Sequence, residues 1–108
     1  MTIVINVKDP RYLHYYKYQI YKMARLKILG IRIGAIEASL NKYLLKKYNI
    51  GLRPLCLHIL RNMTFNSDLS NNIIVKIKNP KLDRIARLIT YGNGQIQGSP
   101  ILQKALSL

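Results

Sequence analysis

The sequence has 108 residues, the size of one folding domain, and 49% of them are hydrophobic, which excludes a disordered chain. Eighteen Lys and Arg residues face four acidic ones, so the formal net charge is +14. Such a charge favours a polyanionic partner or a large assembly, and nucleic acid is the first candidate partner.

Two further exclusions come from single segments. The one cysteine, Cys56, excludes an internal disulfide, and its apolar run "PLCLHIL" predicts a buried, inert thiol. No run approaches the roughly 18 apolar residues that a membrane span needs, and residues 1–10 lack the features of a signal peptide. We therefore expect a protein of a reducing, aqueous compartment, with membrane attachment the least favoured function.

The first third of the chain predicts a strand followed by a long helix. A β-rich run ends at Asp9-Pro10, a pair typical of a helix start because Asp caps the helix and Pro fits its first position. The following helix, residues 11–29, has an apolar stripe at helical spacing. The stripe comprises Leu13, Tyr16, Ile20, Met23, Ala24 and then either Lys27 or Ile28, and it is widened by Tyr12, Tyr15, Tyr18 and Tyr21.

A second helix is predicted over residues 35–50. Gly30 and Gly34 separate it from the first helix, and Gly51 is expected to stop it. Its core stripe would be Ile36, Leu40 and Leu44. In the next segment, residues 52–65, Pro54 argues against a helix at the start, and the remainder fits either a strand or a helix.

The clearest strand covers residues 72–78, after a turn-forming cluster at 66–72. Ile73, Val75 and Ile77 alternate with residues of the opposite face. Asn79-Pro80 then repeats the helix-start chemistry, and residues 81–89 fit a short helix or another strand. Together these elements predict one α+β domain over residues 1–108, with a small antiparallel sheet packed on two main helices and a short C-terminal helix.

The residues that carry catalysis are scarce. Asp9 has a capping role, and His14 and His58 have no partner at a metal-ligand spacing. The segment "GNGQIQG" lacks the Gly-Lys-Ser/Thr of a phosphate-binding loop, so it reads as a turn. We therefore expect no enzyme, no metal, no cofactor and no small-molecule substrate.

The basic residues are spread along the chain, and at this net charge we expect some of them to contact phosphate. Tyrosines between lysines in "YYKYQIYK" can stack on bases, although such a stripe is more often core or a protein interface. The candidate phosphate contacts are Lys42, Lys46, Lys47, Lys76, Lys78, Lys81, Arg84 and Arg87.

The C-terminal segment "ARLITYGNGQIQGSPILQKAL", residues 86–106, is the most specific part of the chain. It resembles the end of the tailed-phage neck proteins, the head–tail joining or tail-completion family, whose pattern is Ala-x-x-Val-Glu-x-Gly-Thr and then Ala-x-Pro-Phe-x-x-Pro-Ala-Leu. Thr90 replaces the family's Glu, and Lys104 replaces its last Pro. Ile101 stands in place of the family's Phe. The residues that occupy the motif positions and are candidates for assembly contacts are Ala86, Ile89, Tyr91, Gly92, Pro100, Ile101, Ala105 and Leu106.

This resemblance implies a non-enzymatic virion protein that forms a homo-oligomeric ring at the head–tail junction, contacts other neck and tail proteins, and turns basic surface toward DNA. Ser99-Pro100 would cap and start a final helix. The apolar face of that helix would close the core of a monomer or pack on a neighbour in a ring. The alternative is an RNA-binding component of a ribonucleoprotein, such as a divergent organellar ribosomal protein. The two readings imply a virion and a ribosome or organelle matrix as the location.

Overall fold

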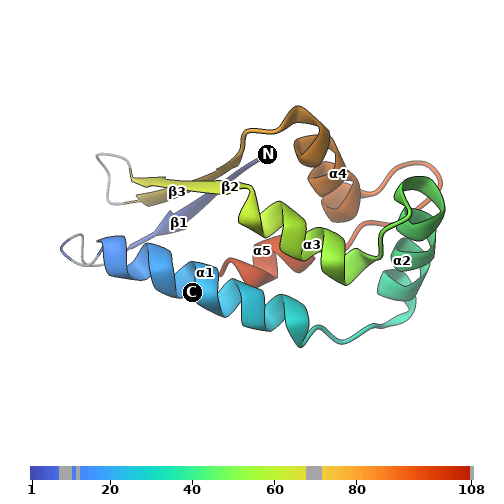
Figure 1. Ribbon diagram of the computed structural model, residues 1–108, viewed down its shortest axis with the longest axis horizontal. Helices are drawn as coiled ribbons and strands as arrows, with labels where there is room; N and C mark the ends of the chain where they lie inside the picture. The colour runs from blue at the N-terminus through green and yellow to red at the C-terminus, as the bar shows by residue number, and fades with distance from the viewer. Residues whose placement is uncertain (8–10, 12, 68–71, 108) are drawn as a thin grey trace.

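The computed structural model describes residues 1–7, 11, 13–67 and 72–107, and for Leu13 only its backbone. Their arrangement confirms the predicted α+β class, with a three-stranded antiparallel sheet and five helices in the described part (Figure 1). The elements are β1 (Thr2–Asn6), α1 (Leu13–Leu29), α2 (Ala35–Tyr48), α3 (Leu52–Arg61), β2 (Met63–Ser67), β3 (Asn72–Ile77), α4 (Pro80–Tyr91) and α5 (Ile101–Ala105).

The sheet has the strand order β1-β3-β2, so the last strand in sequence lies in the middle. Val75 of β3 faces Ile3 on one side and Phe65 on the other. The predicted alternation is confirmed, because Ile73, Val75 and Ile77 are buried. The expected Asp9-Pro10 helix start lies outside the described residues, as does most of the 66–72 turn.

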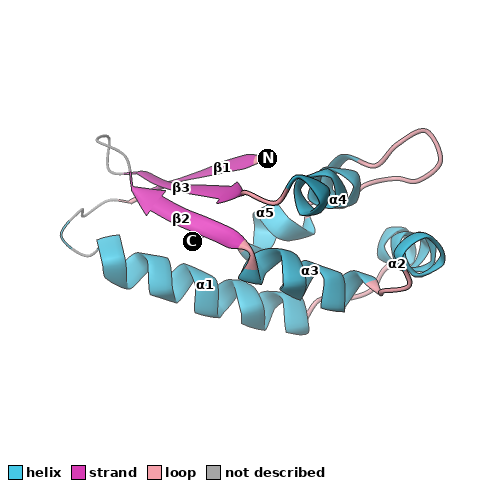
Figure 2. Ribbon diagram, turned by 45° about the horizontal axis from the view of Figure 1, so that its top comes forward, coloured by secondary structure: helices cyan, strands magenta, loops and turns pink. Residues whose placement is uncertain are grey.

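Helix α1 lies along the sheet and α3 (Figure 2), and its Tyr21 ring meets the Phe65 ring of β2 edge to face at 6.3 Å. Its core-facing residues are Ile20, Ala24 and Ile28, as predicted. The prediction for Met23 was wrong: its side chain is 46% exposed. Met23 lies one position off the buried i, i+4, i+8 row, and the 100° rotation per residue carries it away from the core.

Helix α2 buries Leu40 and Leu44 against the core but not Ile36, which was also predicted there. Ile36 lies in the first turn, beside the 95–97 loop, where it is 39% exposed. The helix ends at Asn49, whose φ of 58° is left-handed, so the predicted stop at Gly51 was wrong. Asn tolerates this conformation better than most residues, and Gly51 instead precedes α3 as its N-cap.

Helix α3 starts despite Pro54, so the expectation against a helix there was wrong. The first backbone bond runs from the Leu55 N–H to the Gly51 carbonyl at 3.1 Å. Pro54 is therefore the third helical residue, where an N–H has no partner within the helix and its absence costs little. Cys56 is buried as predicted, and this burial raises the pKa of its thiol to about 12.

Helix α4 begins as the Asn79-Pro80 pair predicts. The Asn79 side chain accepts hydrogen bonds from the backbone N–H groups of Lys81 and Leu82 at 3.0 and 3.2 Å. The helical reading of residues 81–89 is thus confirmed and the strand reading was wrong.

The start of α5 differs from the prediction. Its N-cap is Pro100 rather than Ser99, and no side chain caps it. Ser99 is instead buried, and its backbone N–H donates to the Ile89 carbonyl at 2.7 Å, which ties the chain back onto α4.

One cluster of buried side chains draws on the three strands and the five helices. Of the helices in the described ranges, none has both the length and the apolar character to cross a membrane.

Candidate nucleic-acid interface

The structure brings four of the predicted phosphate contacts to one groove. It lies between the C-terminal end of α2, helix α3 and the N-terminal half of α4, and it extends to Asn62 and Asn79, next to the start of β2 and the end of β3. Its main part has a volume of about 780 Å³. The cations that line this α2–α4 groove are Lys46, Lys47, Lys81 and Arg84.

The floor of the groove is apolar and its walls are neutral or cationic. Leu55, Leu82 and Ile85 are buried beneath it. Neither of the described acidic residues, Glu37 and Asp83, lines it. With four cations and no carboxylate, the groove attracts a polyanion.

The polar side chains in the groove that were missed from the sequence include Tyr48, Asn49, His58 and Asn62. His58 and Asn62 are four residues apart on α3, and the Asn62 amide donates to the His58 carbonyl at 2.8 Å. A polar i, i+4 pair beside an apolar helical stripe was the available signal. The open choice between strand and helix for this segment hid it.

Lys47 is held in place by two tyrosines of its own helix. Its Nζ lies 3.5 Å from the Tyr43 hydroxyl and about 5.5 Å from the Tyr43 and Tyr48 ring centres, within cation–π range. The hydrogen bond with Tyr43 is the main cause that raises the pKa of Lys47. The Tyr43 hydroxyl also accepts from the Asn93 amide at 3.2 Å, and this bond lowers the pKa of Tyr43.

The other four predicted contacts do not line this groove. Lys42, Lys76 and Lys78 are exposed elsewhere on the surface. Arg87 donates from Nε to Asp83 Oδ2 at 3.0 Å, so its charge is partly neutralised. Asp83 also pairs with the N-terminal ammonium of Met1. This ammonium, more than Arg87, lowers the pKa of the Asp83 carboxyl.

We expect Asp83→Asn to lower the free energy of unfolding at neutral pH by about 1–2 kcal/mol, because it removes the part-buried pair with the N-terminal ammonium as well as the solvent-screened pair with Arg87. A carboxyl whose pKa is lower in the folded state than in the unfolded state stabilises the fold fully at a pH above its unfolded pKa, which is about 3.9. This stabilisation is lost as the pH falls through the pKa that the carboxyl has in the folded protein. Urea unfolding of wild type and variant from pH 7 to pH 2.5 should therefore converge in acid, and parallel curves would contradict this role.

The residues that carry the neck-family resemblance occupy α4, a tight loop and α5. Gly92 and Gln97 form an isolated antiparallel bridge. Asn93 closes the loop, since its side chain accepts from the Gln95 and Ile96 backbone N–H groups at 2.7 and 3.0 Å. Gly92 has a φ of 71°. The predicted turn is confirmed, and it reverses the chain between the two helices.

Most of these residues are core residues. Ala86, Ile89, Ile101, Ala105 and Leu106 are each no more than 4% exposed. Helix α5 packs on α1 and α4 within the same chain. Of the two roles expected for the terminal apolar face, the structure therefore assigns closure of the monomer's own core. Tyr91, in contrast, is 72% exposed and free to contact a neighbour.

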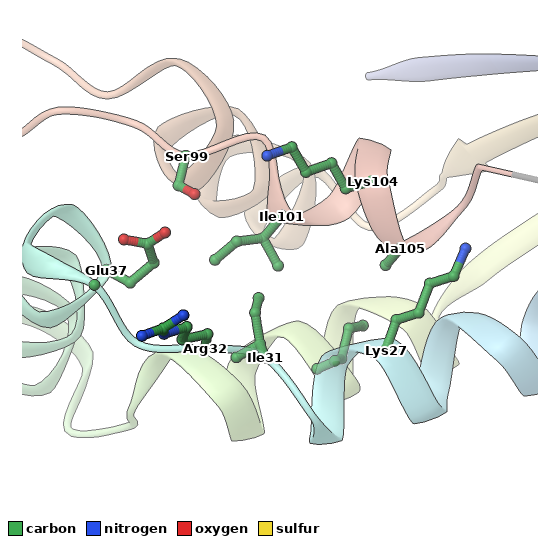
Figure 3. A pocket seen from close by; sticks show the side chains of 10 residues that line it. Lys27, Ile31, Arg32, Glu37, Ser99, Ile101, Lys104 and Ala105 are labelled. Atoms are coloured by element: carbon green, nitrogen blue, oxygen red, sulfur yellow. The ribbon is translucent and has the colours of Figure 1, made fainter.

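A second cavity of about 470 Å³ lies between the end of α1, the 30–34 linker and α5 (Figure 3). Ile31 and Ile101 point toward each other from opposite sides of it, and the Ser99 hydroxyl points into it. Glu37 lies beside Arg32 at one end of this cavity. Its lining therefore carries both positive and negative charges, and it suits a polyanion less well than the α2–α4 groove does. The remaining rim cations are Lys27 and Lys104.

Within the described ranges, no three His, Cys, Asp or Glu side chains lie close enough together to hold a metal ion. Among the described residues that line the two cavities there is no cysteine, and His58 is the one histidine. Comparison of the chain with protein-family models, with curated proteins and with solved structures gave no match.

Proposed function

We propose that this protein is a non-enzymatic structural component of a nucleic-acid-containing particle, and that the α2–α4 groove contacts the phosphate backbone. The particle that fits best is a tailed-phage virion, in which copies of the chain form a ring at the head–tail junction around DNA.

The observation that carries this proposal is the grouping of Lys46, Lys47, Lys81 and Arg84 on a groove whose described lining residues include no carboxylate. Phosphate contacts from Lys and Arg release counterions, so the binding energy depends on charge rather than on base sequence. The Asn79 side chain already occupies two backbone N–H groups at the start of α4. The cationic side chains themselves would therefore make the contacts.

The virion assignment is supported by the residues of the 86–106 pattern. The pattern includes Gly92 and Pro100, which flank the loop between α4 and α5, and the exposed Tyr91. In a ring, like charges on neighbouring copies repel unless a polyanion lies between them. A net charge of +14 per copy is consistent with a DNA-filled channel.

The groove is tested by duplex DNA binding from 50 to 300 mM salt, measured by fluorescence anisotropy. Lys46→Glu/Lys81→Glu should weaken binding at least about tenfold and lower the slope of log K against log salt by about 2. The matched control is Lys42→Glu/Lys76→Glu, which makes the same charge change outside the groove. Equal losses in the two variants would refute a groove-specific contact.

The ribonucleoprotein alternative gives a different outcome in the same assay. If a structured RNA binds much more tightly than the duplex and depends on the same groove, the protein belongs with RNA-binding components. Mass spectrometry of the native particle tests the virion assignment separately. It should find capsid and tail proteins beside this chain, and ribosomal proteins in their place would contradict the assignment.

A further inference from the structure

Helix α1 carries apolar side chains on two opposite faces. One face holds Ile20, Ala24 and Ile28, which are at most 2% exposed and belong to the core. The other face, which we call the outer face, follows a spacing of three, four, four and three residues, which keeps it in one line along the helix. The outer face of α1 comprises Tyr15, Tyr18, Lys22, Leu26 and Leu29.

The apolar members of the outer face are unusually exposed. Tyr15 is 58% exposed, Tyr18 62%, Leu26 54% and Leu29 45%. A surface helix normally has one apolar stripe and a polar opposite face, and a contiguous exposed apolar patch usually marks an interaction site. Tyrosine is also enriched in protein interfaces because its ring buries area while its hydroxyl stays wet.

Lys22 lies in the middle of this stripe, with two apolar residues on either side. Its side chain is exposed, and within the described residues its ammonium forms no ion pair or hydrogen bond. Any partner that covers the stripe must therefore cover a charge at its centre. Burying an ammonium without a partner is costly, so the partner needs an acceptor there, and a carboxylate suits best.

This central charge argues against two other occupants. A second copy that packs its own outer face here in a two-fold pair would bring Lys22 against Lys22. Neither of the described acidic residues would relieve this repulsion, because Glu37 belongs to α2 and Asp83 to α4 rather than to the outer face. A lipid bilayer would have to accept the ammonium on the face that inserts, whereas membrane-surface helices keep their cations on the opposite, polar face.

We propose that the outer face of α1 is a docking surface for an amphipathic helix of a different protein, with an apolar stripe and a Glu or Asp at its centre that pairs with Lys22. The surface belongs to α1, whereas the groove belongs to α2, α3 and α4 (Figure 1). The inference therefore stands independently of the proposed function, and nucleic-acid binding can fail without affecting it.

The test uses the full chain and two synthetic helical peptides of about 20 residues, long enough to form a helix. The peptides share a leucine stripe and differ only in a central Glu or Lys. Isothermal titration should show that wild type binds the Glu peptide at least about tenfold more tightly, as a desolvated charge pair requires. Lys22→Glu should reverse this preference. Lys42→Glu, with the same charge change on α2, should retain it.

A second pair of variants tests the apolar contact. Leu26→Ser should weaken binding of the Glu peptide at least about tenfold, whereas Leu45→Ser, which changes a similarly exposed leucine on α2, should not. The proposal is overturned if wild type binds neither peptide or if Lys22→Glu leaves the preference unchanged. Two other results would also overturn it. One is that wild type binds anionic lipid vesicles and Leu26→Ser abolishes this binding. The other is that wild type forms a concentration-dependent dimer and Leu26→Ser abolishes this dimer.

Discussion

Gly92→Ala is expected to lower the free energy of unfolding by about 3–5 kcal/mol, since backbone strain and a steric clash add at one position. Gly92 has φ 71° and ψ −163°, a region that is almost closed to residues with a Cβ. A Cβ there would also lie 2.3 Å from the Ile96 carbonyl oxygen and 2.6 Å from the Gly98 nitrogen. These are backbone atoms of the same tight loop, so they cannot move aside without opening it.

The matched control is Gly94→Ala, two residues further along the loop. A Cβ at Gly94 meets nothing within 4 Å, and the φ of Gly94 is not positive. We expect its stability to stay within about 0.5 kcal/mol of wild type. Gly98→Ala should resemble Gly92→Ala, because its Cβ would approach the Thr90 carbonyl oxygen to 2.4 Å. Similar urea midpoints for Gly92→Ala and Gly94→Ala would contradict the loop geometry.

Leu102→Ala should lower the free energy of unfolding by about 2–5 kcal/mol, as expected for a large cavity in a packed core. Leu102 is 1% exposed, and its helix packs on α1 and α4. The five-residue α5 is too short to be stable by itself, so its burial holds the C-terminal segment in place. Lys27 adds one polar tie, since its Nζ donates to the Ser107 carbonyl at 2.8 Å.

Leu45→Ala provides the comparison, because Leu45 is 45% exposed on α2. Its expected cost is below about 1 kcal/mol. Thermal and urea unfolding of both variants should separate them clearly. If Leu102→Ala is as stable as Leu45→Ala but loses self-association, the terminal helix serves assembly rather than the core, and the intrachain packing described above is contradicted.

Local chemistry explains where prediction from the sequence succeeded. The Asn79-Pro80 start of α4 depends on an acceptor and a fixed φ that lie next to each other in the chain. The period-two pattern of β3 follows from the side chains alternating across a sheet with one buried face. Neither feature requires knowledge of distant residues.

The failures share a different cause. Met23 and Ile36 are apolar and fit a helical stripe, but which of the apolar residues on a helix are buried depends on what packs against it. Pro54 was read as a helix breaker because a rule for helix interiors was applied before the start of α3 was known. Ser99 satisfied the composition of an N-cap, yet its backbone is bound to Ile89 ten positions earlier.

The α2–α4 groove likewise has a part that the sequence predicts and a part that depends on packing. All four of its cations were among the candidates read from the sequence, and so were Lys42, Lys76, Lys78 and Arg87, which lie outside it. The net charge of +14 predicts phosphate contacts but does not indicate which cations make them. Only the packing of α2 and α4 against α3 determines which lysines share a surface. The outer face of α1 was visible as a run of tyrosines, but nothing in the sequence showed that it stays uncovered.

By itself, then, the sequence determined the α+β class, the central strand, the capped start of α4, the glycine turn and the excess of positive charge. Each depends on residue type or on spacing within one segment. The tertiary structure alone decided which stripe of each helix is buried, that α5 closes the core, and that Lys46, Lys47, Lys81 and Arg84 meet. These depend on contacts between residues far apart in the chain, and the pattern of a single segment carries no information about its partners.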